Sequence, residues 1–187
     1  FDHAIDNTTK ASNKFETLIM RPGNMENYTS GYNPFLNIYI RDPMIRDLQL
    51  NISGYGTRNI FAHMYFNGLY WGVYDITEQV EPYMCEQYFG GREEDWFMTK
   101  ACSKDHETGC TVYGSPDRFL EFMDIIDKAD FTQADVLENI QQYIDVPAFA
   151  EYMIIYNFWG IGDWPDNNWI FVINNGQKPV PGRFFSW

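Results

Sequence analysis

The chain is organised around one stretch, Trp159-Gly160-Ile161-Gly162-Asp163-Trp164-Pro165-Asp166-Asn167-Asn168-Trp169. Before it, apolar residues recur at helical spacing from Phe149 to Trp159, and two glycines then interrupt the pattern. The run from Trp169 to Ile173 is aromatic and branched, which is typical of a strand. The sequence therefore predicts a helix, a short loop rich in acidic and amide side chains, and a strand in direct succession.

Within this loop, Asp163 stands five positions ahead of Asn168. The same spacing separates two residues of the protein-kinase catalytic loop, an Asp that orients the attacking hydroxyl and an Asn that holds a metal ion. Asp and Asn also crowd ordinary turns, because their side chains hydrogen-bond to the nearby backbone. Both interpretations stay open on spacing alone, and the rest of the chain has to separate them.

The composition is that of a globular protein, since hydrophobic residues make up 45% of the 187 residues and aromatic residues 18%. This length suffices for one domain with a sizeable core or for two small lobes. The formal net charge of -13 argues against binding to nucleic acid, because contact with the phosphate backbone needs clustered Lys and Arg. No apolar run approaches the roughly 20 residues that span a bilayer, so the sequence predicts no transmembrane segment.

The three cysteines, Cys85, Cys102 and Cys110, fit neither a CxxC metal site nor a dense disulfide framework. Cys102 and Cys110 are close enough in sequence to close a small loop in an oxidising compartment. That pairing would leave Cys85 free, and we expect it to be buried. The histidines are too scattered to predict a zinc site.

Turn residues and periodicity predict the elements of the first hundred residues. The clearest is a hairpin whose arms, residues 60–66 and 69–76, flank the pair Asn67-Gly68, which favours a type I′ turn. We also expect, in chain order, a strand at 15–21, a helix at about 43–53 with Pro43 in its first turn, a helix at 78–88, and a strand from 95 that carries Lys100.

After a polar stretch at 101–114 that predicts no regular element, the pattern becomes helical. Helices are expected from Asp117, from a cap at Thr132 and from a cap at Asp145. A second hairpin, with arms at 169–173 and 183–187, follows the central loop.

The order of these elements predicts an α+β fold. Its sheet-rich part covers about 15–100 and its helical part 116–187, with a boundary near 101–115. The whole of 1–187 then belongs to one domain built from two parts.

Four segments together resemble the spore coat protein H (CotH) family of atypical protein kinases. They read FNGLYWGVY at 66–74, TEQV at 77–80, GDWPDNNW at 162–169 and RFFSW at 183–187. The NG-x-YWG-x-Y and DWPxNNW strings are specific in combination, and the similarity spans about 15–187. The resemblance implies a protein-kinase-like fold with a sheet-rich N-terminal lobe and a helical C-terminal lobe, the latter C-terminally truncated in this chain.

The resemblance also implies phosphoryl transfer from ATP to Ser or Thr hydroxyls of a protein substrate, with magnesium as the metal ion. Carried over residue by residue, Asp163 is the catalytic aspartate that orients the acceptor hydroxyl. Asn168 is a magnesium ligand through its amide oxygen, a hard donor that suits the ion. If the register slips by one residue, Asn167 takes that role instead.

Kinases also place a cation on the phosphates, usually a Lys paired with a Glu. Lys100 and Glu78 are the candidates for this pair, although their order in the chain is the reverse of that in ordinary kinases. Arg46 is a further candidate for a phosphate contact. Ordinary roles compete with all three: a solvated strand-edge charge for Lys100, a favourable charge at a helix start for Glu78, and a surface ion pair for Arg46.

The family places a second metal-binding Asp directly after the strand that ends at Trp187, where this sequence stops. We therefore expect the fragment to be inactive by itself. The alternative function is a non-catalytic surface or coat module that keeps the fold and binds partners or glycans. A third possibility, a carbohydrate-active enzyme with Asp163 and Asp166 as paired carboxylates, lacks a second acidic cluster. Export to the cell surface or to a coat would suit both the kinase and the non-catalytic module.

Overall fold

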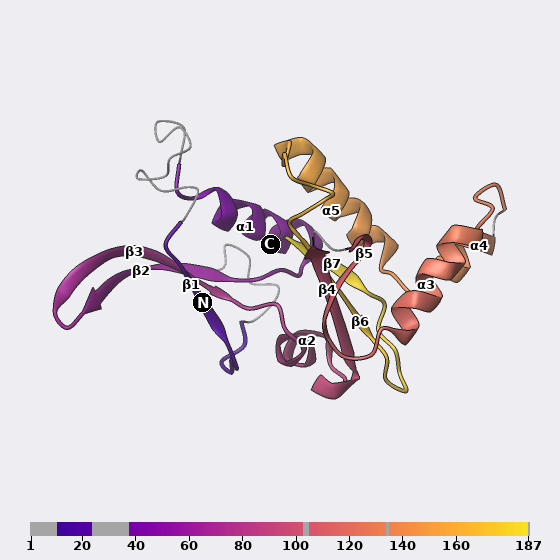
Figure 1. The fold of residues 1–187 in the computed structure, drawn as a ribbon, viewed down its shortest axis with the longest axis horizontal. Coiled ribbons are helices and arrows are strands. Elements are labelled where there is room, and N and C mark those ends of the chain that lie inside the picture. Colours follow the sequence, from indigo (N-terminus) through magenta and orange to yellow (C-terminus); the bar gives the residue numbers. More distant parts are fainter. Residues whose placement is uncertain (1–10, 24–37, 103–104, 134, 187) are drawn as a thin grey trace. The chain divides into compact units, whose positions relative to one another are not determined.

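The computed structural model describes residues 11–23, 38–102, 105–133 and 135–186 (Figure 1). The chain divides into two compact units, Phe1–Gln79 and Val80–Trp187. Helices and antiparallel strands occur in both units, which confirms the predicted α+β class. The boundary that the sequence predicts at 101–115 falls inside the second unit.

The first unit holds a three-stranded antiparallel sheet and a helix, namely β1 (Leu18–Arg21), α1 (Arg41–Ser53), β2 (Asn59–Phe66) and β3 (Leu69–Glu78). β3 is the central strand, and the order across the sheet is β1-β3-β2. Asn67 and Gly68 join β2 to β3 with φ angles of 50° and 81°. A type I′ turn requires positive φ at both positions, so the predicted hairpin is confirmed.

α1 confirms the predicted helix but buries polar as well as apolar side chains. Ile45 is buried, as helical spacing predicts, and so are Leu50, Arg46 and Gln49. Ile52 is 46% exposed, although its spacing matches that of the apolar residues. Because charged atoms are costly to bury alone, the buried face of α1 must find partners on the sheet.

The helix predicted at 78–88 is present, but its predicted first residue is wrong. Glu78 is the last residue of β3, where it lies opposite Leu18 of β1. The helix α2 (Pro82–Phe89) begins at a proline, which lacks a backbone N–H and suits the first turn. Pairing with β1 keeps the chain extended through Glu78. The residues around Glu78 do not indicate this pairing, because β1 is distant in the sequence.

The second unit contains a four-stranded antiparallel sheet in the order β5-β4-β6-β7. The predicted hairpin is present as β6 and β7, and β4 and β5 extend it into a larger sheet than the sequence predicts. β6 lies inside this sheet, and all of its residues are buried. After α2, the elements are η2 (Glu93–Asp95), β4 (Trp96–Cys102), β5 (Asp105–Tyr113), α3 (Asp117–Lys128), α4 (Asp135–Ile140), α5 (Val146–Trp159), β6 (Trp169–Asn174) and β7 (Arg183–Ser186).

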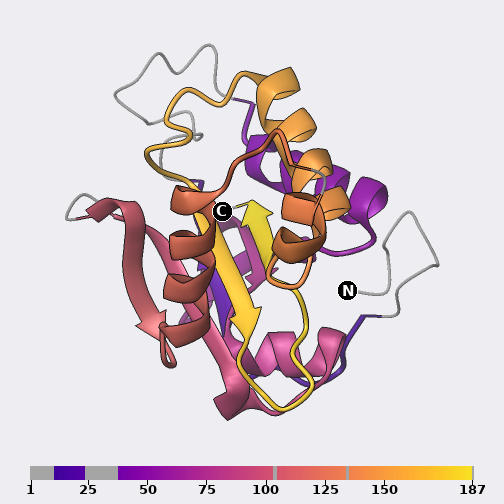
Figure 2. The same cartoon turned by 90° about the vertical axis from the view of Figure 1, so that its right-hand side faces the viewer.

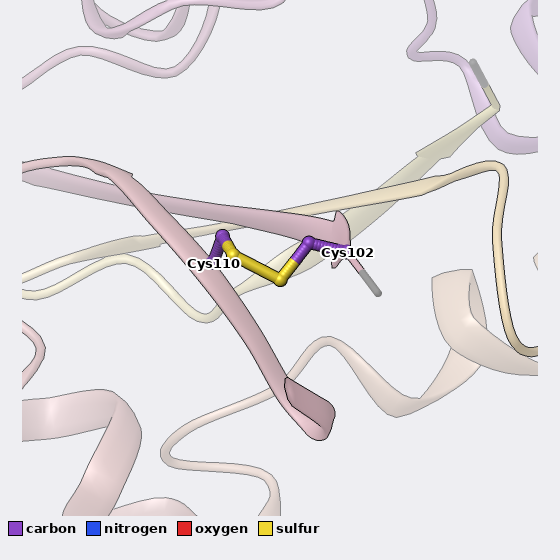
Figure 3. Close-up of a disulfide and its surroundings, with 2 residues drawn as sticks. All are labelled: Cys102 and Cys110. Atoms are coloured by element: carbon purple, nitrogen blue, oxygen red, sulfur yellow. A yellow bond between two sulfur atoms is a disulfide. The ribbon is translucent and has the colours of Figure 1, made fainter. Parts of the chain in front are cut away.

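Within the stretch 101–114, Asp105–Tyr113 forms the strand β5, where the sequence predicts no regular element. β5 pairs with β4 so that Cys110 lies opposite Lys100. A disulfide joins Cys102 to Cys110 across this pair, as Figure 3 shows. β5 lies at the edge of the sheet, where a strand can be largely polar, and its composition therefore resembles that of a loop. Cys85 is free and buried, as predicted.

Aromatic side chains form much of the core of the second unit. The Phe171 ring of β6 lies with its centroid 5.4 Å from that of Phe119 and 6.3 Å from that of Phe122, both on α3. Figure 2 shows α3 lying along the sheet beside β6. Aromatic residues bury large apolar areas, so these contacts hold β6 firmly at the point where the chain enters it from the central loop.

The helices after the sheet follow the prediction in part. α3 begins at Asp117, as expected. α4 begins at Asp135, whereas the sequence predicts a helix capped by Thr132. The Thr132 hydroxyl donates to Asp130 Oδ1 at 2.7 Å, so this side chain closes a local turn instead.

Asp145 caps α5 as predicted. Its Oδ1 accepts a hydrogen bond from the backbone N–H of Ala148 at 3.2 Å. Its Oδ2 lies 2.8 Å from Nη2 of Arg183 on β7. One carboxylate therefore fixes the start of α5 and connects this helix to the last strand of the sheet.

We expect the Asp145→Ala substitution to lower the free energy of unfolding by about 1–2 kcal/mol, because the helix loses its cap. The Asp145→Asn variant is the matched control, since it keeps an accepting oxygen and loses the charge. It should cost less than about 1 kcal/mol, the usual contribution of a partly exposed ion pair. Urea unfolding followed by circular dichroism measures both. Equal losses in the two variants would show that the ion pair, not the cap, carries the effect.

Candidate functional site

The candidate site is the loop that joins α5 to β6. Gly160, directly after the helix, has a left-handed φ of 58°, which turns the chain out of the helix. The carbonyl of Asp163 accepts a hydrogen bond from the backbone N–H of Asn167 at 2.7 Å. The side chains of Asp163 and Asn167 are exposed, and that of Asn168 is half-buried. One turn of the backbone therefore carries a carboxylate and two amide side chains.

Two buried aromatic side chains hold this loop. The Tyr156 hydroxyl of α5 donates to the carbonyl of Asn168 at 2.9 Å. The indole Nε1–H of Trp169 donates to the carbonyl of Pro165 at 2.8 Å. Because Tyr156 is 3% exposed and Trp169 9%, both bonds start from fixed positions in the core. The loop is thus attached to the rigid elements before and after it, as a preorganised site requires.

Lys100 lies in the same sheet as the strand that leaves the loop. In β4 it is opposite Ile170 of β6, which follows Asn168 by two residues. Directly opposite residues in a sheet point to the same face, so Lys100 shares a face with Ile170. The second unit therefore brings Lys100 close to the exit of the Asp163 loop.

Arg46 and Glu78 lie in the first unit, each in an ion pair that the sequence does not predict. Arg46 Nη1 is 2.9 Å from Asp75 Oδ2, and both side chains are buried. Glu78 Oε2 accepts the backbone N–H of Arg58 at 2.7 Å and lies 3.8 Å from its Nη1. The surface ion pair considered for Arg46 is therefore wrong. The pairing of Glu78 with Lys100 joins residues of different units and stays a prediction.

Burial shifts the pKa values of Arg46, Asp75 and Asp47 toward the neutral forms of these side chains. Burial lowers the pKa of Arg46, and the charge of Arg21 lowers it further, while Asp75 opposes the shift. Burial raises the pKa of Asp75 against the opposing effect of Arg46. Burial and the charge of Asp75 raise the pKa of Asp47 on α1. The Arg46–Asp75 pair thus forms at a substantial desolvation cost, which the short contact has to offset.

The loop offers oxygen donors of the kind that magnesium prefers. Asp163 supplies a carboxylate and Asn168 an amide, and magnesium is commonly held by one or two such ligands together with substrate phosphates and water. Among the described residues, no three His, Cys, Asp or Glu side chains group closely enough to hold a metal ion. By their donor chemistry alone, the carboxylate and amide of the loop are suitable ligands for a magnesium ion.

In the first unit, sequence reasoning missed Asp75 and Arg58, the partners of Arg46 and Glu78. The sequence carried a signal for Asp75, which interrupts the apolar second arm of the hairpin. A charge inside such a strand needs a partner when the strand is covered. The identity of that partner depended on how α1 lies on the sheet, which the sequence does not reveal.

The protein is of the α+β class. Its candidate catalytic and metal-binding residues lie on one loop, which joins an apolar helix to an antiparallel hairpin. The chain matches the family model described as CotH kinase protein over residues 27–184, and it belongs to this family. The resemblance stated from the sequence is thereby confirmed.

Family membership suggests a kinase-like transferase function, with a general dependence on a nucleotide and a metal ion and with a protein as the substrate. No curated protein and no solved structure matches the chain. Within the described residues, no helix combines the length and the apolar character needed to cross a membrane.

Proposed function

We propose that the protein is an atypical kinase that transfers a phosphoryl group from ATP to Ser or Thr hydroxyls of a protein, with magnesium, on a two-lobed kinase-like fold. The observation that carries this proposal is the Asp163–Asn168 loop. Tyr156 and Trp169 tether it between a helix and a buried strand, in a chain of the CotH kinase protein family. Kinase catalysis is mostly positioning and charge stabilisation, and a tethered loop is suited to both.

Within this proposal each loop residue has a separate role. Bound magnesium and ATP supply the γ-phosphoryl group and neutralise its charge. Asp163 accepts a hydrogen bond from the acceptor hydroxyl and takes its proton as the new O–P bond forms, while the bond from the γ-phosphorus to the bridging oxygen breaks and ADP leaves. Asn168 would hold the metal ion through its amide oxygen, with Asn167 as the alternative ligand. Lys100, on the neighbouring strand β4, supplies positive charge to the phosphates.

The first unit contributes Arg46 and Glu78 to nucleotide binding in this proposal. Their partners Asp75 and Arg58 keep the two side chains in fixed positions. A fixed side chain loses less conformational entropy when a ligand binds, so these ion pairs are compatible with a binding role.

The test uses the natural full-length protein, including any residues that follow Trp187, with γ-labelled ATP, magnesium chloride and casein as a Ser-rich acceptor. We expect an alkali-labile label on protein, which disappears when EDTA removes the magnesium. Calorimetry should show binding of ATP in the presence of magnesium. A folded protein that neither binds ATP nor transfers the label would overturn the proposal.

A non-catalytic binding module is the second candidate, and the outer part of the β2–β3 hairpin favours it. Phe66, Leu69 and Trp71 are 55%, 71% and 64% exposed. Phe66 lies opposite Leu69, and its ring centroid is 5.8 Å from that of Trp71. Exposed apolar residues that adjoin one another commonly mark a binding surface. If replacing Trp71 with Ala abolishes binding to a partner or glycan while no ATP is bound by the natural protein, this second function is the better one.

A further inference from the structure

The Cys102–Cys110 disulfide lies at one end of a series of contacts that reaches the candidate loop. It crosslinks β4 and β5 at a point where Cys110 is directly opposite Lys100, and the two cysteine Cα atoms are 5.6 Å apart. Figure 3 shows the bridge spanning the two strands. Both cysteines are half-buried rather than enclosed, so a small thiol reagent can reach the bridge.

Gly109, the residue before Cys110, packs directly against the central strands. A Cβ atom at this position would lie 2.6 Å from Cη2 of the Trp169 ring and 2.5 Å from the carbonyl oxygen of Lys100. The φ of Gly109 is 73°, which a residue with a side chain rarely adopts. The ring of Trp169 therefore extends from β6 across β4 to the backbone of β5, and only glycine leaves room for it.

Trp169 carries this contact into the loop. Its Nε1–H donates to the carbonyl of Pro165, inside the Asp163–Asn168 turn, at 2.8 Å. The Trp169 ring also packs against the Phe184 ring of β7, and the two ring centroids are 6.0 Å apart. A displacement of β5 at Gly109 thus removes one of the packing contacts of the Trp169 ring. Because the same ring is hydrogen-bonded to Pro165, the displacement also affects the loop backbone.

We propose that Trp169 is a positioning residue for the Asp163 loop, and that the Cys102–Cys110 disulfide controls this positioning through Gly109. The proposal rests on the proposed kinase function for its effect on rate. Reduction by a dithiol breaks the S–S bond by two successive thiolate attacks. Cys102 and Cys110 each gain a proton and become thiols, and the dithiol is oxidised to its own disulfide.

The reduced hairpin loses its crosslink, β5 separates from β4 near Gly109, and Trp169 no longer holds Pro165 in one position. Asp163 then lies less often in the geometry that transfer requires. The enzyme is therefore most active in compartments where disulfides persist. Cys85 does not take part in the exchange, because it is buried and its thiol is held in the protonated form by burial, which raises its pKa.

Hydrogen exchange on the natural full-length protein, with and without dithiothreitol, tests the coupling. Reduction should speed exchange of the Asn167 amide, which bonds to the carbonyl of Asp163, by at least about tenfold. In the kinase assay, kcat should fall by about tenfold or more with little change in KM for ATP, since displacement by about 1 Å can cost 10²-fold.

Three variants separate coupling from general destabilisation. The Cys102→Ser, Cys110→Ser double variant should show the exchange rate and kcat of the reduced protein, and addition of the reductant should change neither. Gly109→Ala, with the disulfide intact, should speed exchange at Asn167, because its Cβ displaces the Trp169 ring. Cys85→Ala should respond to the reductant as the natural protein does.

The proposal is overturned if reduction speeds exchange in β5 while exchange at Asn167 stays unchanged. It is also overturned if kcat falls only in proportion to the unfolded fraction measured by circular dichroism. A protein without any kinase activity would refute the proposed function, whereas the exchange measurement would still decide whether the disulfide and the loop are coupled.

Discussion

Replacing Asp163 with Ala in the natural protein is expected to lower the rate of phosphoryl transfer by about 10²- to 10⁴-fold, the range typical of a lost general base. The side chain is exposed, and the hydrogen bond that closes the loop uses the backbone carbonyl of Asp163, which the substitution keeps. The melting temperature and the binding of ATP with magnesium should therefore stay close to those of the natural protein. Single-turnover transfer of label from ATP, measured beside calorimetry, separates the two effects.

The matched control is Asp166→Ala, which removes an exposed carboxylate from the same loop. It should transfer phosphate at nearly the natural rate, because only Asp163 has the kinase-like spacing to Asn168. Comparable losses in both variants would show that Asp166 also serves the transfer, so that the spacing to Asn168 does not single out Asp163. Unchanged transfer in Asp163→Ala would remove this residue from the mechanism.

Elements with local signals were predictable from the sequence. The Asn67-Gly68 pair predicted its hairpin because few other residues accept positive φ at both turn positions. Asp145 predicted the start of α5, because a carboxylate placed before a helix can accept from its free N–H groups. Gly160 marked the end of the same helix. Each of these signals lies within a few residues of the structure that it determines.

Elements that depend on distant partners were not predictable in the same way. Glu78 belongs to a strand because β1 pairs with it, and β5 is a strand because β4 and the disulfide hold it at the edge of the sheet. In both places the local composition favoured another structure. The competing tertiary contacts were stronger than the local preference.

The residues of the candidate site also differ in whether local sequence or distant contacts place them. Asp163, Asn167 and Asn168 lie in one loop, as the sequence predicts, because they are neighbours in the chain. Lys100 comes near them only through the pairing of β4 with β6. The attachments of the loop to Tyr156 and Trp169 were missed, since aromatic side chains in a core give no indication of which carbonyl they reach.

A second large effect is expected at the buried pair in the first unit. Asp75→Ala should lower the free energy of unfolding by about 3–5 kcal/mol, because it leaves the guanidinium of Arg46 buried without its main partner. Asp42 lies 3.9 Å from Arg46 Nη2 and is partly exposed, so it replaces little of the lost interaction. The shift of the urea unfolding midpoint, followed by circular dichroism, measures the loss. A loss below about 1 kcal/mol would show that Arg46 reaches solvent when Asp75 is absent.

The double variant Arg46→Met, Asp75→Leu tests whether the pair serves stability or nucleotide binding. Removing both charges together leaves neither unpaired, so its stability should return to within about 2 kcal/mol of the natural protein. Apolar side chains of similar size can fill the buried site, but they offer no positive charge to a phosphate. If Arg46 contributes to nucleotide binding, this folded variant should bind ATP at least about tenfold more weakly, a loss in keeping with one charged hydrogen bond. Natural affinity in a folded double variant would instead assign Arg46 to the structure of the first unit and leave Lys100 as the remaining candidate for the phosphates.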